Sequence, residues 1–168
     1  TVSYRELDDT VDRFATFLDD RGYGRGDTIL LLLQNCPQYV IAYYAAQKLG
    51  MRVSPCSPLS KEHRVSYQLE DGGARIAVAG DTHASTLEAV RDETPLEEIV
   101  YARLETYLPA EPVPAIHEDM AAAIESERRP ESDGVRYFDS ILAETPANPP
   151  SVEVAMDDIC LLQYTSGT

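Results

Sequence analysis

Lysine is nearly absent from this 168-residue chain: Lys48 and Lys61 are the only two, so almost all of its 14 basic residues are arginines. Acidic residues number 29, which gives a formal net charge of -15. Such a surface repels polyanions, and this argues against nucleic acid or an anionic membrane as the main partner. Acidic excess with little lysine favours adaptation to high salt, where ions screen the self-repulsion; an acidic protein of ordinary salt conditions is the alternative.

Long apolar runs are also missing. The run from Ile29 to Leu33 has the length of a strand, and none approaches the roughly 20 residues that a membrane-spanning helix needs. We therefore predict no transmembrane segment and no signal peptide, and we expect a cytoplasmic protein. The sequence begins at Thr1, directly in a patterned segment, so we expect that the chain is a piece of a longer one.

Cysteine and histidine are scarce and scattered. Neither a C-x-x-C pair nor a mixed cluster of the two residue types is present among Cys36, Cys56, Cys160, His63, His83 and His117. Metal sites and redox sites both need such ligands at close spacing. We predict no metal-ligating residues here, and interpret the cysteines as ordinary residues of a reducing compartment.

What the chain does have is a regular alternation of helical and strand patterns. Ser3 and Glu6 form a capping-box pattern before an amphipathic stripe, and Pro37 suits the first turn of a second helix. The helices are expected at 3–22, 37–50, 61–71 and 84–93, and the strands at 28–35, 51–55, 75–80 and 97–102. This order predicts an α/β fold in which βαβ units form a largely parallel sheet flanked by helices.

The alternation fails after Arg103. Residues 103–136 carry four prolines among many acidic residues, so we interpret them as a surface excursion with one short helix at 118–126. A helix at 137–144, a proline-rich linker at 145–151 and a last strand at 157–164 are expected to follow.

The last four residues are the candidate binding site. Thr165, Ser166, Gly167 and Thr168 place hydroxyl groups around one glycine directly after the expected strand. Hydroxyl and backbone N–H groups donate to phosphate oxygens, and glycine lets the backbone approach an anion closely. An ordinary turn at the end of a strand is the alternative interpretation. The chain contains no G-x-x-x-x-G-K-[ST] phosphate loop.

Several stretches resemble, in order, the adenylate-forming (AMP-binding) enzyme family, which includes acyl-CoA synthetases. "SYREL" is similar to its opening helix, "RGYGRGDTILLLLQNCPQYVIAYYAAQKLG" to its first strand and following helix, and "VSPCSPLSKEHRVSYQLEDGGARIAV" to its next turn, helix and strand. "DDICLLQYTSGT" resembles the approach to the family's phosphate loop and that loop's first half. The resemblance covers about 1–101 and 137–168; the segment before Pro58 departs from it, with Ser57 where the family often has Asn.

The resemblance implies that residues 1–168 are part of the large N-terminal domain, ending inside the phosphate loop. The intact enzyme would be an ATP-dependent carboxylate–CoA ligase of fatty-acid metabolism, using ATP, Mg²⁺, coenzyme A and a carboxylic acid. Thr165, Ser166, Gly167 and Thr168 would bind the β- and γ-phosphates, while the catalytic residues would lie beyond Thr168. The chain by itself would then be inactive. A non-catalytic βαβ binding or regulatory module is the alternative.

Three other groups of polar or aromatic residues are interpreted structurally. Asn35 is expected to hold the turn before Pro37 through its side chain. Asp157 and Asp158 are adjacent and would point to opposite faces of a strand, so we interpret them as a solvated turn rather than a metal pair. The tyrosines of the expected helices are assigned to core or interface packing: Tyr39, Tyr43, Tyr44 and Tyr67.

Overall fold

A computed structural model describes residues 2–109, 111–112 and 128–165 of the chain. Within that part, helices and strands alternate as the sequence predicts, and the α/β fold class is confirmed. The helices are α1 (Tyr4–Asp20), α2 (Pro37–Lys48), α3 (Glu62–Gly72), α4 (Ala84–Arg91) and α6 (Phe138–Glu144), with 3-10 turns η1 (Asp81–His83) and η2 (Leu104–Tyr107). The strands are β1 (Thr28–Leu32), β2 (Arg52–Pro55), β3 (Ala74–Gly80), β4 (Glu98–Ala102) and β5 (Val135–Tyr137).

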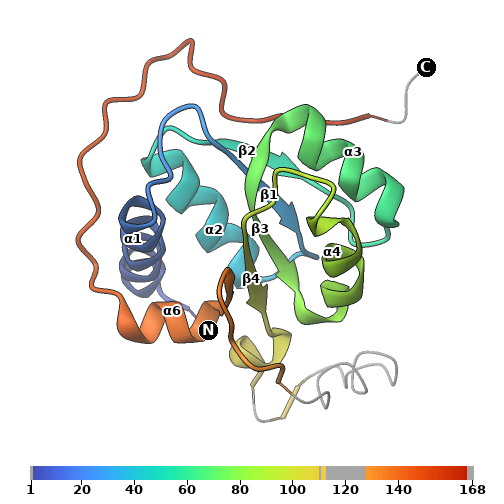
Figure 1. Ribbon diagram of the computed structural model, residues 1–168. Helices are drawn as coiled ribbons and strands as arrows, with labels where there is room; N and C mark the ends of the chain where they lie inside the picture. The colour runs from blue at the N-terminus through green and yellow to red at the C-terminus, as the bar shows by residue number, and fades with distance from the viewer. Residues whose placement is uncertain (1, 110, 113–127, 166–168) are drawn as a thin grey trace.

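The strands form one parallel sheet in the order β2-β1-β3-β4-β5. Strand β1 pairs with β2 on one side and with β3 on the other. The chain therefore runs outward from β1 to the β2 edge and then returns across β1 to build the rest of the sheet (Figure 1). The boundary between β1 and β3 is the point at which the direction of winding changes.

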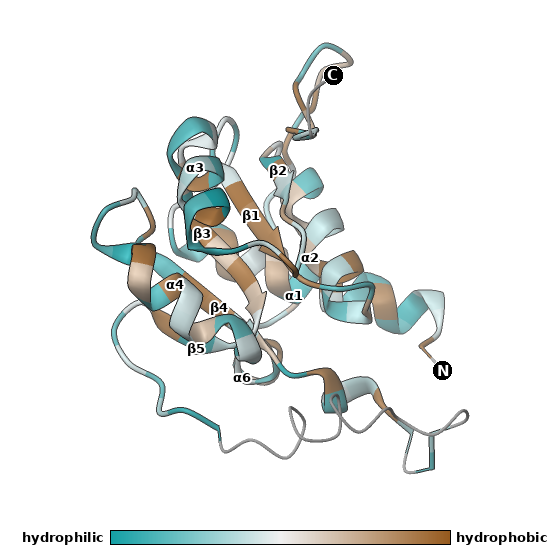
Figure 2. Ribbon diagram, turned by 90° about the vertical axis from the view of Figure 1, so that its right-hand side faces the viewer, coloured by the Kyte–Doolittle hydropathy of each residue, from teal (hydrophilic) through white to brown (hydrophobic). Residues whose placement is uncertain are grey.

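Helices cover both faces of the sheet, which explains the uninterrupted apolar run of β1. Helices α1, α2 and α6 lie on one face, with Phe14, Ile41 and Phe138 in the core there. Helices α3 and α4 cover the other face through residues such as Leu69 and Leu87. Figure 2 shows the hydrophobic colour gathered on the central strands. Every residue of β1 is buried, as expected for a strand that is covered twice.

The start of α1 has the hydrogen bonds that its sequence predicts. The Ser3 hydroxyl accepts from the Glu6 backbone N–H at 3.3 Å, and a Glu6 carboxylate oxygen accepts from the Ser3 N–H at 2.7 Å. The Ser3 hydroxyl also donates to the Glu6 carboxylate at 2.7 Å. The pKa of Glu6 is lowered by the donation from the Ser3 backbone N–H first and by that from the Ser3 hydroxyl second. The capping box fixes the first turn, and the helix then buries Val11, Phe14 and Leu18 against the sheet.

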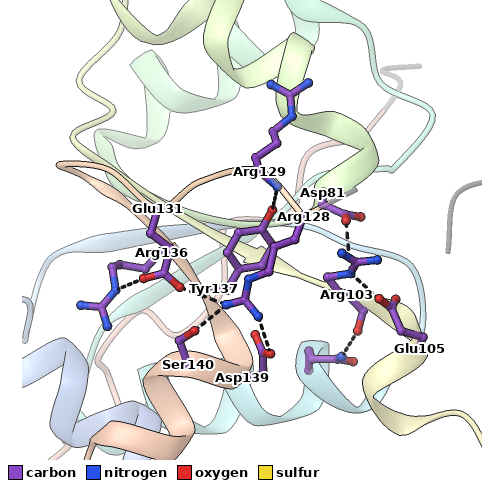
Figure 3. A network of polar contacts seen from close by, with 11 residues as sticks. Asp81, Arg103, Glu105, Arg128, Arg129, Glu131, Arg136, Tyr137, Asp139 and Ser140 are labelled. Atoms are coloured by element: carbon purple, nitrogen blue, oxygen red, sulfur yellow. Dashed lines mark hydrogen bonds and ion pairs between the residues drawn. The ribbon is translucent and has the colours of Figure 1, made fainter. Parts of the chain in front are cut away.

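Strand β5 was not expected from the sequence. It lies at the end of the segment interpreted as a surface excursion and pairs with β4 from Val135 onward. An arginine-rich network covers this edge: the Arg128 guanidinium lies 4.0 Å from the centre of the Tyr137 ring and also pairs with Asp139 at 2.8 Å (Figure 3). The expected helix at 118–126 lies outside the described residues.

Candidate functional site

The segment after α6 leads toward the candidate phosphate loop. It passes around the α1 side of the molecule, crosses β2 and reaches α3 (Figure 1). Val53 of β2 donates its N–H to the Cys160 carbonyl at 3.0 Å, and the Leu162 N–H donates to the Val53 carbonyl at 2.8 Å. These two bonds dock the segment on the outer edge of the sheet.

The predicted last strand at 157–164 is wrong. Within the segment only Leu161 makes a β-bridge, an isolated parallel one to Val53. The reason is a turn just before it, in which the Asp158 N–H donates to the Ala155 carbonyl at 3.1 Å. The Asp158 carboxylate accepts from the Ala155 N–H and pairs with Arg25 at 2.6 Å. Both contacts lower the pKa of Asp158, and the bond from Ala155 contributes more. Asp158 is thus a turn residue, as the sequence interpretation has it, and its ion pair with Arg25 was not foreseen.

Thr165, the first of the four predicted binding residues, lies beside α3 with its side chain exposed. It lines a pocket together with Tyr164 of the same segment and with four residues of α3: His63, Arg64, Tyr67 and Gln68. Ser166, Gly167 and Thr168 lie outside the described residues. The structure therefore locates the beginning of the loop, along the outer face of α3 rather than at the end of a sheet strand.

The chemistry of this pocket suits an anion. Its lining contains the Thr165 hydroxyl, the Arg64 guanidinium and the His63 imidazole, and no carboxylate. Most arginines of this acidic chain are tied to Asp or Glu, whereas Arg64 has no carboxylate partner among the described residues. Arginine and hydroxyl donors are the groups that hold phosphate oxygens in proteins.

A second pocket lies where the direction of winding changes, at the carboxyl ends of β1 and β3. This is the place at which open α/β sheets bind ligands. It is lined by Leu32, Leu33, Gln34, Gly80, Asp81, Thr82, His83, Leu104 and Glu105. The sequence analysis missed this pocket, although the sequence indicates it. Asp81 and His83 directly follow the apolar strand β3, and Glu105 comes three residues after the end of β4.

Arg103 organises the charges of this second pocket (Figure 3). Its guanidinium lies 3.7 Å from the Asp81 carboxylate and is also in contact with Glu105. Burial raises the pKa of Asp81, while Arg103 opposes the rise. Burial also lowers the pKa of His83, against the nearby Asp81 charge. The pocket thus presents two carboxylates, Asp81 and Glu105, and Arg103 pairs with both of them from beside it.

Other sequence interpretations have mixed outcomes. Tyr39 and Tyr43 pack against the core, as expected, but Tyr44 and Tyr67 are 54% and 55% exposed. Asn35 is exposed, and α2 begins at Pro37 without a side-chain cap.

Within the described residues, no three His, Cys, Asp or Glu side chains are grouped to hold a metal ion. In the same part of the chain, no helix has the length and apolar character to cross a bilayer.

The described residues thus form a parallel sheet covered on both faces by helices, with a pocket lined by Arg64, His63 and Thr165 on the outer face of α3. The family model for AMP-binding enzymes matches residues 1–168. The chain therefore belongs to the AMP-binding enzyme family, as its sequence motifs predict.

Similar proteins agree with this assignment. Rice (Oryza sativa subsp. japonica) 4-coumarate–CoA ligase 3 is 29% identical over 168 residues, which are 100% of this chain and 25% of that protein. A Salmonella typhimurium long-chain-fatty-acid–CoA ligase is 25% identical over 171 residues, covering 99% of this chain and 30% of the relative. The chain thus spans between a quarter and a third of the length of these relatives.

Solved structures share the fold. The anthranilate CoA ligase AuaEII, in complex with anthranoyl-AMP, superposes with a TM-score of 0.76 at 20% identity, covering 97% of this chain and 27% of that one. The acyl-CoA synthetase of Brucella canis gives a TM-score of 0.75 at 20% identity, covering 99% and 26%.

The charge arrangement of the second pocket predicts a pH-dependent stability effect. Replacing Arg103 by Met leaves Asp81 and Glu105 without their shared cation, and should lower the free energy of unfolding by about 2 kcal/mol at neutral pH. Without Arg103 the folded-state pKa of Asp81 rises further above its unfolded value. Protonation then favours the folded state, so the penalty should shrink as the pH falls toward about 4.

Urea unfolding of both proteins across this pH range measures the effect. Arg129→Met is the matched control, because Arg129 and its partner Glu88 are 48% and 56% exposed, and an exposed pair contributes below about 1 kcal/mol. A penalty for Arg103→Met that is no larger than that of the control, or that grows in acid, contradicts the interpretation.

Proposed function

We propose that this chain is part of an ATP-dependent carboxylate–CoA ligase. The observation that carries the proposal is the match of the AMP-binding family over residues 1–168, which includes the Thr-Ser-Gly-Thr sequence that begins beside α3. The curated relatives bear the names 4-coumarate–CoA ligase and long-chain-fatty-acid–CoA ligase. The latter supports a substrate drawn from the carboxylic acids of fatty-acid metabolism. Because ATP and coenzyme A are held inside cells, we also propose a cytoplasmic location.

The proposed reaction has two steps. A carboxylate oxygen attacks the α-phosphorus of ATP, the bond to the β-phosphate breaks, and pyrophosphate leaves acyl-AMP behind. The thiol sulfur of coenzyme A then attacks the acyl carbon, and AMP departs. In both steps negative charge develops on oxygen atoms, and fixed donors that are already aimed at those atoms lower the barrier.

The part assigned to this chain is binding of the β- and γ-phosphates. Thr165, Ser166, Gly167 and Thr168 are proposed to hold them through hydroxyl and backbone N–H groups. The position of Thr165 in a pocket with Arg64 and His63 supports an anionic occupant. The described residues offer no cluster of three or more His, Cys, Asp or Glu side chains that could hold Mg²⁺. We propose that the ion arrives bound to the nucleotide phosphates.

The function is tested on the full-length protein by measuring pyrophosphate release from ATP with fatty, aryl and short carboxylic acids. Release should depend on one class of acid, and Thr165→Ala should raise the KM for ATP at least about tenfold, which is what the loss of one hydrogen bond to a charged group predicts. Thr10→Ala is a suitable control, because the Thr10 hydroxyl bonds only within α1. Release that never depends on an acid would favour a non-catalytic binding module.

Salt adaptation is proposed as a second property, based on the net charge of -15. In dilute buffer the Debye length grows to about 30 Å, so surface carboxylates repel one another over much of the molecule. Added KCl screens this repulsion and should raise Tm by several degrees between about 0.01 M and 1 M. Thermal unfolding monitored by circular dichroism measures the shift. A Tm that stays flat or falls over this range contradicts the proposal.

A further inference from the structure

Tyr164, the residue directly before the phosphate loop, is held by two side chains of α3. Its hydroxyl donates to an Asp71 carboxylate oxygen at 2.7 Å. Its ring meets the Tyr67 ring edge to face, with centroids 6.0 Å apart and an interplanar angle of 81°. The side chain is therefore fixed both at its polar tip and along its apolar body.

The two holding residues are placed for this task by the helix itself. Tyr67 and Asp71 are four residues apart, so they lie one above the other on the same face of α3. The terminal segment lies directly against this end of the helix: a Cβ built on the next residue, Gly72, would be in van der Waals contact with a methyl carbon of Leu162 at 3.5 Å and with the Tyr164 hydroxyl at 3.6 Å.

A second anchor lies two residues earlier. Leu162 is fixed through its backbone N–H to the Val53 carbonyl of β2. Between this bond and the Tyr164 side chain there is a single residue, Gln163. The chain that enters the loop is thus constrained at residues 162 and 164, and the position of Thr165 follows from them.

We propose that Asp71 and Tyr67 are positioning residues of the proposed phosphate loop, which hold Tyr164 so that Thr165, the first residue of that loop, has a fixed place. The inference rests on the proposed phosphate-binding function of the loop. Asp71 does not line the pocket beside Thr165, whereas the Tyr67 ring forms part of its wall. Their effect is exerted through Tyr164, because preorganised donors stabilise a developing charge better than donors that must be ordered during the reaction.

The charges at this contact agree with a positioning role. The Asp71 carboxylate is not among the groups that line the pocket beside Thr165, although it holds Tyr164, which does line it. Burial and the Asp71 carboxylate together raise the pKa of Tyr164 to about 12. The hydroxyl therefore keeps its proton, and remains a donor to Asp71, throughout the physiological pH range.

The test compares variants of the full-length protein in acid-dependent pyrophosphate release without coenzyme A. Asp71→Ala and Tyr164→Phe should each raise the KM for ATP at least about tenfold, as expected for losing a hydrogen bond to a charged group. The KM for the acid and Tm should stay unchanged. Asp71→Asn keeps an acceptor oxygen and should restore part of the loss. The double variant Asp71→Ala/Tyr164→Phe should be no worse than either single one.

Glu70→Ala is the matched control: it removes a neighbouring carboxylate whose recorded side-chain partner is Ser66, not Tyr164, and should leave all constants unchanged. An active wild-type protein in which Asp71→Ala does not change the KM for ATP overturns the inference and leaves the proposed function standing. Equal changes in the KM for ATP and for the acid, with a lower Tm, also overturn it, because they indicate a purely structural contact. A wild-type protein without acid-dependent release refutes the proposed function, and the inference with it.

Discussion

The parallel pairing of β1 with strands on both of its sides is the constraint on which the other features of this structure depend. Its residues are completely buried between two layers of helices. Apolar burial of this kind stabilises by about 25 cal/mol for each Å² removed from water. Because helices cover both faces of β1, the side chains on both of its faces contribute to this stabilisation. Because β1 lies inside the sheet between β2 and β3, β2 becomes an edge strand and the boundary between β1 and β3 becomes the switch point.

Each of these two consequences is associated with a pocket. The edge of β2 is open on its outer side, and the terminal segment binds there through Val53 before it reaches α3. The switch point opens a pocket at the carboxyl ends of β1 and β3, where Arg103 balances Asp81 and Glu105. The two sites differ in charge. The pocket beside α3 presents Arg64 and His63, whereas the pocket at the switch point is lined by the carboxylates of Asp81 and Glu105.

The sequence predicted the central elements well, because their signals are local. The apolar run of β1, the capping box at Ser3 and Pro37 at the start of α2 each depend on a few neighbouring residues, and all three agree with the structure. The family, too, was recognisable from ordered motifs. Helix α4 ends at Arg91 rather than at residue 93, which is the usual uncertainty at a helix end.

The features that the sequence did not predict depend on contacts between residues that are distant in the sequence. Strand β5 has three residues, one of them Arg136, and forms because β4 offers an open edge and the arginine network covers it. The terminal segment has the apolar pattern of a strand, yet it pairs with only one strand, β2, through a single bridge at Leu161. The turn at Asp158 interrupts it as well. The role of Asp71 is equally invisible in the sequence, because its partner Tyr164 is 93 residues away.

The central claim is that the approach to the phosphate loop is docked on β2 and α3. Amide hydrogen exchange of the Leu162 N–H, followed by nuclear magnetic resonance, measures this most directly. If the bond to the Val53 carbonyl holds, this amide should exchange at least about 100-fold more slowly than in an unstructured peptide, while the amide of the fully exposed Met156 should exchange freely. Exchange of Leu162 at the unstructured rate, with β1 still protected, would contradict the account.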